Sequence, residues 1–179
     1  MQLQACVFPT KLGWFGLAGT DGCVRRLVIA HRVSDEAWKA LRKHFGEDEL
    51  VKANWHPTLR QRLQDFAAGK KVSFHDFTLH TEHRTEFQQH VLAATQAIGY
   101  GEVVSYGELA ARVGSPKAAR AVGAVMASNE IPILIPCHRV VGSSGKLTGF
   151  SAPRGVRLKE EMLAMEAANS SEVLELRRR

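Results

Sequence analysis

Three cysteines are the strongest candidate nucleophiles in this chain of 179 residues, and one of them has unusual neighbours. Cys6 and Cys23 stand alone, and no two cysteines have the C-x-x-C spacing, so free thiols are expected. Cys137 ends a short apolar run that closes on a proline, and His138 and Arg139 follow it directly. A thiol has a pKa of roughly 8.5, which falls beside a cation or a histidine. The segment therefore indicates a candidate nucleophile, although a cysteine after an apolar run is more often an inert core residue.

The activating base and its partner must come from other elements or from a turn. Successive side chains on an extended chain point to opposite faces, so His138 is expected to reach Cys137 through a turn or a bridging water. A C-terminal helix is expected over about residues 156–168, with Met162 in its apolar stripe. Glu166 follows Met162 by four residues and shares its face. An acid on an apolar face needs a partner, so we predict a Glu166–His138–water–Cys137 relay. The alternative is an acid in solvent at the helix end.

The helices that position these groups occupy the second half of the chain. A capping box at Thr85 and Gln88 is expected to begin the first of them. Two shorter helices are expected over 106–113 and 117–128, around a tight turn at 114–116. Two short helices around a glycine-containing turn are typical of a helix-turn-helix, and also of ordinary helix pairs in a core.

The first third of the chain is expected to form a small α/β domain with an antiparallel sheet. Turn residues separate the first three strands, Ser34 is expected to cap a helix, and Pro57 to open another. Strands are expected over 2–8, 12–18, 23–30 and 72–79, and helices over 34–45 and 57–69. The predicted fold class is α+β, with an α/β domain at 1–80, a mostly helical domain at 81–168 and a flexible tail at 169–179.

Composition and charge narrow the classes of function. Apolar residues make up 45% and charged residues 23%, as in an ordinary globular protein. The net charge of +6 suits a polyanionic partner without requiring one. The apolar stretch at 131–136 is too short to cross a bilayer, and the N-terminus lacks the pattern of a secretory signal. We therefore expect no membrane association and an intracellular location, cytoplasmic in a bacterium or archaeon and nuclear in a eukaryote.

Metal binding is not expected from the spacing of the available ligands. Cys6, Cys23 and His31 lie in the first third of the chain, but their separations match no standard zinc motif. The prediction is no metal and no cofactor.

Several linked motifs resemble one family of DNA-repair proteins. The pentapeptide Pro136-Cys-His-Arg-Val140 is similar to the signature of the O6-alkylguanine-DNA alkyltransferases. The resemblance extends over about residues 87–167 and includes segments 100–106, 116–123 and 145–149. It implies a ribonuclease-H-like N-terminal domain, a helix-turn-helix in the C-terminal one, and irreversible transfer of an alkyl group from O6-alkylguanine to the protein.

The resemblance assigns a role to each residue near the cysteine. Cys137 matches the alkyl acceptor, His138 the water-mediated base and Glu166 the acid that orients the histidine. Asn129 matches the residue that ties the helix-turn-helix to the active-site loop. Tyr106 matches the tyrosine that helps the guanine to leave, by crowding the phosphate of the flipped nucleotide and donating a proton towards N3.

The resemblance also implies double-stranded DNA containing O6-alkylguanine as the partner of a monomeric protein. Arg120 matches the arginine that enters the base stack in place of the flipped nucleotide, which offsets part of the cost of flipping. Its helix would be pressed into the minor groove, with weak sequence preference and strong salt dependence. The other residues of this helix expected to face DNA are Lys117, Ala119, Ala121 and Gly123.

The pocket wall departs from the family pattern. Pro136, Val140, Phe150 and Ser151 match pocket residues, with Ser151 as a donor to O6 and the carbonyls of Cys137 and Val140 as acceptors from the guanine amino group. Phe150 stands where the family usually has tyrosine, and segment 152–155 is about two residues longer than usual. We expect the reaction to be retained and the tolerance for bulky alkyl groups to differ.

Two other classes of function stay open at this point. Alkyltransferase-like proteins bind alkylation damage without repairing it, but they lack the acceptor cysteine that is present here. A cysteine hydrolase using Cys137 and His138 would turn over repeatedly and would need neither DNA nor Arg120.

Overall fold

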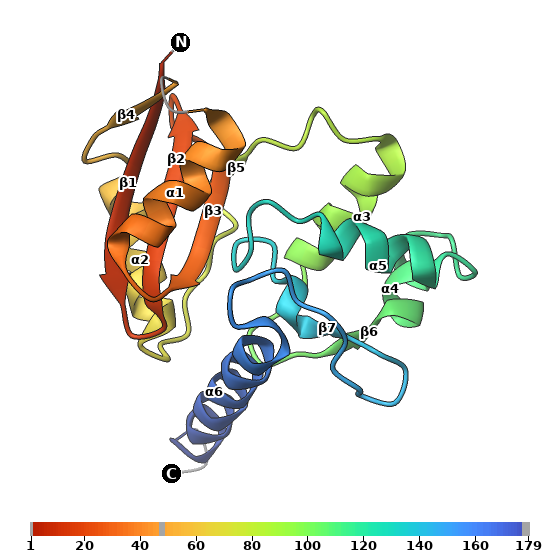
Figure 1. The fold of residues 1–179 in the computed structure, drawn as a ribbon. Coiled ribbons are helices and arrows are strands. Elements are labelled where there is room, and N and C mark those ends of the chain that lie inside the picture. Colours follow the sequence, from red (N-terminus) through yellow and green to blue (C-terminus); the bar gives the residue numbers. More distant parts are fainter. Residues whose placement is uncertain (1, 47–48, 177–179) are drawn as a thin grey trace. The chain divides into compact units, whose positions relative to one another are not determined.

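The computed structural model describes residues 2–46 and 49–176. Contacts divide the chain into two compact units (Figure 1). The first contains Met1–His80 together with Glu130–Pro132, and the second contains Thr81–Asn129 and Ile133–Arg179. The short segment Glu130–Pro132 thus leaves the second unit and returns to it within a few residues of Cys137.

A five-stranded sheet forms the centre of the first unit, in the order β4-β1-β2-β3-β5. The three long central strands pair antiparallel, as their turn residues predicted. The prediction of an antiparallel sheet is wrong at both edges, because β4 pairs parallel to β1 and β5 parallel to β3. Each edge strand follows a helix, and a crossover of this kind permits parallel pairing. The strands are β1 (Leu3–Thr10), β2 (Gly13–Thr20), β3 (Cys23–His31), β4 (Leu50–Lys52) and β5 (Thr78–Leu79).

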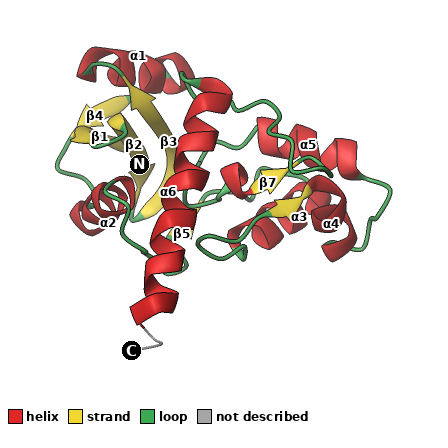
Figure 2. Ribbon diagram, turned by 90° about the horizontal axis from the view of Figure 1, so that it is seen from below, coloured by secondary structure: helices red, strands yellow, loops and turns green. Residues whose placement is uncertain are grey.

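Two helices cover opposite faces of this sheet, α1 (Ser34–Phe45) and α2 (Pro57–Ala67), as Figures 1 and 2 show. On the α1 side, Leu41 packs against alanines of the sheet in a fully buried cluster. The helix begins at Ser34, as the sequence predicts, but Ser34 does not cap it. The helix has no side-chain cap, and the Ser34 hydroxyl instead donates to Asp35.

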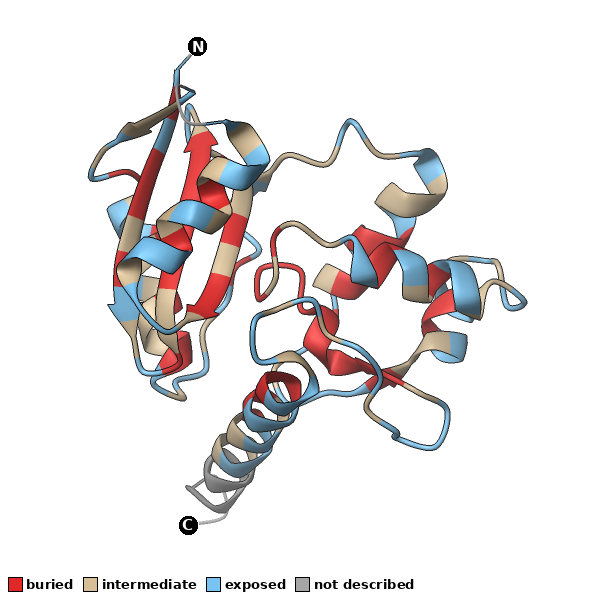
Figure 3. Ribbon diagram, viewed as in Figure 1, coloured by how far each residue is buried: buried red, intermediate tan, exposed pale blue. Residues whose placement is uncertain are grey.

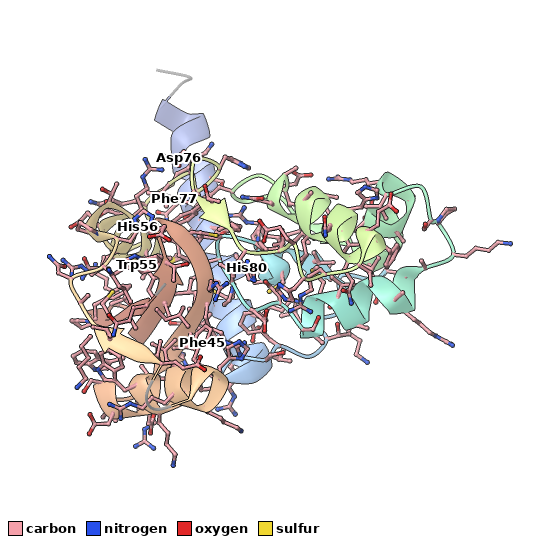
Figure 4. The ribbon with its side chains drawn as sticks, turned by 90° about the horizontal axis from the view of Figure 1, so that it is seen from above. Phe45, Trp55, His56, Asp76, Phe77 and His80 are labelled. Carbon is pink, nitrogen blue, oxygen red and sulfur yellow. The ribbon has the colours of Figure 1, made fainter. Side chains whose placement is uncertain are left out.

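The last strand is shorter than expected because aromatic packing occupies the residues before it. Phe74 is buried against the α2 side chain Phe66, and the ring of Phe77 lies against His56, next to Trp55 (Figure 4). Only Thr78–Leu79, after these aromatic residues, pairs with β3.

Helices make up most of the second unit, and their starts follow the sequence signals. A capping box at Thr85 and Gln88 begins α3, as predicted, and a second one at Ser105 and Glu108 begins α4. The elements are α3 (Glu86–Gln96), β6 (Val104–Ser105), α4 (Tyr106–Arg112), α5 (Ala119–Ala127), the 3-10 helix η1 (Cys137–Arg139), β7 (Val140–Val141) and α6 (Gly155–Leu176).

The short parallel pair of β6 and β7 links the parts of the second unit that carry the predicted chemistry. Tyr106 follows β6 directly, and the Cys137–Arg139 turn precedes β7 directly. The turn and β7 are buried (Figure 3). Helix α6 is longer than expected and continues through Leu176, across the stretch predicted as a tail, while residues 177–179 lie outside the described part. No helix in residues 2–46 and 49–176 has the length and apolar character needed to span a membrane.

Candidate active site

The turn at Cys137 changes how neighbouring side chains are directed. Residues Cys137–Arg139 form a single turn of 3-10 helix, and the Cys137 amide donates to the Ile135 carbonyl at 2.7 Å. All three side chains of the turn are buried. Because the backbone is turned here, His138 and Arg139 both reach Glu166 on α6, which an extended chain would not allow.

Glu166 is fully buried and accepts hydrogen bonds from three residues. His138 Nε2 lies 2.9 Å from Oε1 of Glu166, and the Gly101 amide donates to Oε2 at 3.0 Å. The Arg139 guanidinium donates to both carboxylate oxygens through Nε and to Oε1 through Nη2. The contact with His138 is the one that helix spacing predicted. Burial alone would raise the pKa of Glu166, but the hydrogen bonds and charges of His138 and Arg139 outweigh it and lower the pKa to about 2. Glu166 is therefore ionised at neutral pH.

The ionised acid fixes the tautomer of His138. Burial lowers the pKa of His138 despite the favourable contact with Glu166, so the ring is neutral at pH 7. An ionised carboxylate can only accept hydrogen bonds, so the single ring proton lies on Nε2 and is donated to Glu166. The Nδ1 atom of His138 then carries a lone pair and can accept a proton. This is the state that a general base must have.

The thiol of Cys137 is buried, with 6% of the residue exposed. Burial raises the pKa of Cys137, and the Asn129 side chain, the Lys159 charge and backbone amides oppose this rise. Asn129 Nδ2 lies 3.1 Å from Sγ and 2.9 Å from the Ile135 carbonyl, so one amide holds both the thiol and the chain that leads to it. The resting group is a protonated thiol, and Asn129 and Lys159 offset part of the cost of forming its anion.

The cation near the thiol is Lys159, which the sequence analysis missed. Only 1% of Lys159 is exposed, and its Nζ donates to the Val140 carbonyl at 2.6 Å and lies 5.9 Å from the centre of the Tyr106 ring. Burial lowers the pKa of Lys159, while the neighbouring Cys137 opposes that shift. Arg139, the cation that follows Cys137 closely in the sequence, is not this group, because its guanidinium binds Glu166 and the Ile98 carbonyl. A helix-spacing signal existed, since Lys159 precedes Met162 by three residues and Glu166 by seven.

An open pocket of about 640 Å³ lies in the same unit. One wall is a face of α5 with little side-chain bulk, formed by Ala119, Gly123 and Ala127 at four-residue spacing. Arg120 also lines the pocket and is exposed. The other lining residues are Tyr106, Thr148, Gly149, Phe150 and Ser151.

Hydrogen bonds already engage two polar groups of this pocket wall. The Tyr106 hydroxyl accepts from Thr148 at 3.1 Å, and the Ser151 hydroxyl donates to the Ala127 carbonyl at 2.9 Å. Ser151 is thus held against the end of α5 and would have to turn to donate to a ligand. The Val140 carbonyl already accepts from Lys159, although a carbonyl oxygen has a second lone pair for a ligand amine.

The remaining predicted residues are distributed around these groups. Pro136 is buried next to the cysteine, whereas Lys117, just before α5, and Ala121, within it, are exposed. The structure therefore brings Cys137, Asn129, His138 and Glu166 together, and separately places most of the predicted DNA-facing and pocket residues around the pocket. Cys137 itself is not among the residues that line this pocket.

The other two cysteines lie in the first unit. Cys6 is buried, its thiol donates to the Trp55 carbonyl, and burial raises its pKa to about 11. Cys23 is half-buried at the start of β3. Within the described residues, no three potential metal ligands of the His, Cys, Asp and Glu types gather into a group.

Comparison with known proteins identifies the family. Residues 86–168 match the model of the 6-O-methylguanine DNA methyltransferase DNA binding domain. A methylated-DNA–protein-cysteine methyltransferase of Mycolicibacterium paratuberculosis is 38% identical over 93% of this chain and 94% of its own length. The chain belongs to the methylated-DNA–protein-cysteine methyltransferase family. A further member, from Mycobacterium bovis, is 48% identical over 90% of both chains.

Solved structures of this family share the fold. The match to the crystal structure of Mycobacterium tuberculosis OGT in complex with DNA covers 94% of this chain and 94% of that one, with a TM-score of 0.76 and 32% sequence identity. The O6-methylguanine methyltransferase of the same organism gives a TM-score of 0.77 at 31% identity, again over 94% of both chains. The mixed α/β architecture seen here is therefore that of methyltransferases in this family.

Proposed function

We propose that this chain repairs O6-alkylguanine in double-stranded DNA by transferring the alkyl group to the sulfur of Cys137. The chain is a DNA-repair alkyltransferase, in keeping with its family. The observation that carries the choice of acceptor is the amide of Asn129 at the Cys137 sulfur together with the buried Lys159, since both favour a sulfur anion against the cost of burial. The Cys6 thiol instead donates to the Trp55 carbonyl, an acceptor that cannot stabilise a sulfur anion.

The transfer is a single displacement at carbon. The Cys137 proton passes through a bridging water to Nδ1 of His138, whose other nitrogen is fixed by the ionised Glu166. The sulfur anion attacks the alkyl carbon, the S–C bond forms, and the bond from carbon to guanine O6 breaks. The guanine leaves with the bonding electron pair and takes up a proton near N3, for which Tyr106 is the donor. The thioether has no route back, so each chain reacts once.

The nucleotide must leave the duplex before this reaction can occur. Flipping costs a few kcal/mol of stacking and pairing, and we expect Arg120, an exposed residue of the pocket lining, to enter the stack and offset part of that loss. Ala119 and Gly123 leave room for the nucleotide beside α5, and Phe150 offers a ring for stacking. Tyr106 joins the pocket to the reaction centre, because it lines the pocket and its ring lies near Lys159.

We further propose that α4 and α5 act as a helix-turn-helix that binds the minor groove, in a monomeric protein and with weak sequence preference. Support comes from the short connection between these helices and from two exposed basic residues, Lys117 just before α5 and Arg120 in its first turn. The antiparallel β1-β2-β3 strands, with β4 parallel to β1, support a ribonuclease-H-like description of the first unit.

The acceptor is tested with duplex DNA that carries O6-methylguanine labelled in its methyl group. The wild-type chain is expected to take up the label and restore guanine, whereas Cys137→Ser binds the duplex and takes up none. Cys23→Ser is the matched control and should react like the wild-type chain. Label on Cys137→Ser would show that another residue is the acceptor. Binding without transfer by the wild-type chain would contradict the proposal.

A further inference from the structure

Tyr106 is held by contacts with three other parts of the second unit. Its ring lines the pocket beside Gly123 of α5, where an added Cβ atom would lie 3.9 Å from Cε1 of the ring. Lys159 Nζ of α6 lies 5.9 Å from the centre of the ring. The Tyr106 hydroxyl accepts a hydrogen bond from Thr148 Oγ1 at 3.1 Å. Of these three contacts, the one with Thr148 acts on the hydroxyl, which is the group that the proposed reaction uses.

The loop that carries Thr148 is tied down on both sides of this residue. Before it, the Gly142 amide donates to the Lys146 carbonyl at 2.9 Å and closes a turn. After it, the Ser151 hydroxyl donates to the Ala127 carbonyl of α5 at 2.9 Å. Thr148 therefore lies between two fixed points of the chain.

The hydrogen bond from Thr148 determines what the Tyr106 hydroxyl can do. A hydroxyl has one proton to donate and two lone pairs that accept. Because the Tyr106 oxygen accepts from Thr148, its own proton is left for an acceptor in the pocket that both residues line. A hydroxyl that accepts one hydrogen bond is also polarised, so it donates the next one more strongly. The contact thus prepares the phenol to donate to a ligand.

We propose that Thr148 is a positioning residue that directs the Tyr106 proton towards N3 of the departing guanine. The inference rests on the proposed function, in which Tyr106 is the proton donor. The guanine leaves with the electron pair of the broken bond between carbon and O6, and the proton from Tyr106 balances that charge. The phenolate then recovers a proton from solvent through the open pocket. Thr148 acts through Tyr106 and does not itself take part in these steps.

The test is a double-mutant cycle of Thr148→Val and Tyr106→Phe on duplex DNA containing O6-methylguanine, with the protein in saturating excess. Thr148→Val keeps the shape of the side chain but removes its hydroxyl, and it should lower the single-turnover rate constant about twofold to tenfold, the range for one hydrogen bond. In the Tyr106→Phe background the same substitution should change nothing further, because the hydroxyl through which it acts is gone. Thr148→Ser should keep the wild-type rate constant. So should the matched control Ser144→Ala, which removes an exposed hydroxyl from the same loop.

Two further measurements separate positioning from a structural role of Thr148. Thr148→Val should keep the wild-type affinity for the duplex, which a collapsed pocket wall would lower. It should also keep the pH profile of Cys137 alkylation by iodoacetamide, because Cys137 does not line this pocket.

Three results would overturn the inference while leaving the choice of acceptor intact. In the first, Thr148→Val transfers at the wild-type rate. In the second, it slows transfer by the same factor with and without the Tyr106 hydroxyl. In the third, Thr148→Ser is as slow as Thr148→Val. A wild-type chain that transfers no methyl group would instead contradict the proposed function itself, and the inference with it.

Discussion

Replacing Glu166 with glutamine tests the buried network beneath the cysteine. Glutamine has the same shape but no charge, so it leaves the Arg139 guanidinium buried without its counter-ion, at 7% exposure. Removing one partner of a buried ion pair costs about 3–5 kcal/mol. The pKa of Glu166 gives a similar value: about 2 in the folded chain against 4.5 in the unfolded one corresponds to about 3 kcal/mol at neutral pH. With a urea m value of about 2 kcal/mol/M, the unfolding midpoint should fall by about 2 M.

The same network predicts how stability depends on pH. The folded-state pKa of Glu166 lies below the unfolded value, so its contribution is complete above pH 4.5 and is lost as the pH falls towards 2. Glu166→Gln should lack this component, and the difference in unfolding free energy from wild type should therefore shrink between pH 6 and pH 3. Glu161→Gln is the matched control on the same helix, because its ion pair with Arg154 is exposed and should contribute less than about 1 kcal/mol. A cost for Glu166→Gln as small as that of the control, or a difference that does not change with pH, would refute the reasoning.

Three further predictions concern the reaction itself. Lys159→Met removes the buried cation near the thiol and should slow transfer at pH 7 about tenfold, as expected if the pKa of Cys137 rises by about one unit; an unchanged rate would exclude the electrostatic role. Because burial lowers the pKa of His138 below its ordinary value of 6.5, the transfer rate should stay level as the pH falls through 6.5 and decline only at lower pH; a midpoint above 6.5 would contradict a neutral buried base. Arg120→Ala should slow repair of duplex DNA far more than reaction with free O6-methylguanine, and equal losses on the two substrates would rule out its insertion into the base stack.

Sequence reasoning succeeded where one local rule determined the outcome. Helix spacing placed Glu166 on the buried face of α6, and burial of a charge then required a partner, which His138 supplies at 2.9 Å. The same spacing puts Lys159 on that face, but lysine is usually exposed, so its sequence position alone does not predict burial. A long side chain that is only 1% exposed is an exception that spacing alone does not predict.

Long-range contacts account for what the sequence could not predict. Arg139 follows His138 directly, and only the 3-10 turn turns it towards Glu166, away from the role of activating the thiol. The parallel edge strands β4 and β5 depend on pairings between residues far apart in the chain. The positive φ of Ile133 contradicts the preference of a β-branched residue, so tertiary contacts must impose it.

The central claim is that Cys137 accepts one alkyl group and is consumed. The most direct test is the intact mass of the chain after incubation with an excess of duplex DNA containing O6-methylguanine, followed by peptide mapping. The account predicts a mass gain of one methyl group in place of one hydrogen, carried on the peptide that contains Cys137, and no more repaired guanine than there are protein molecules. Repaired guanine in excess of protein, or a methyl group on Cys6 or Cys23, would contradict it.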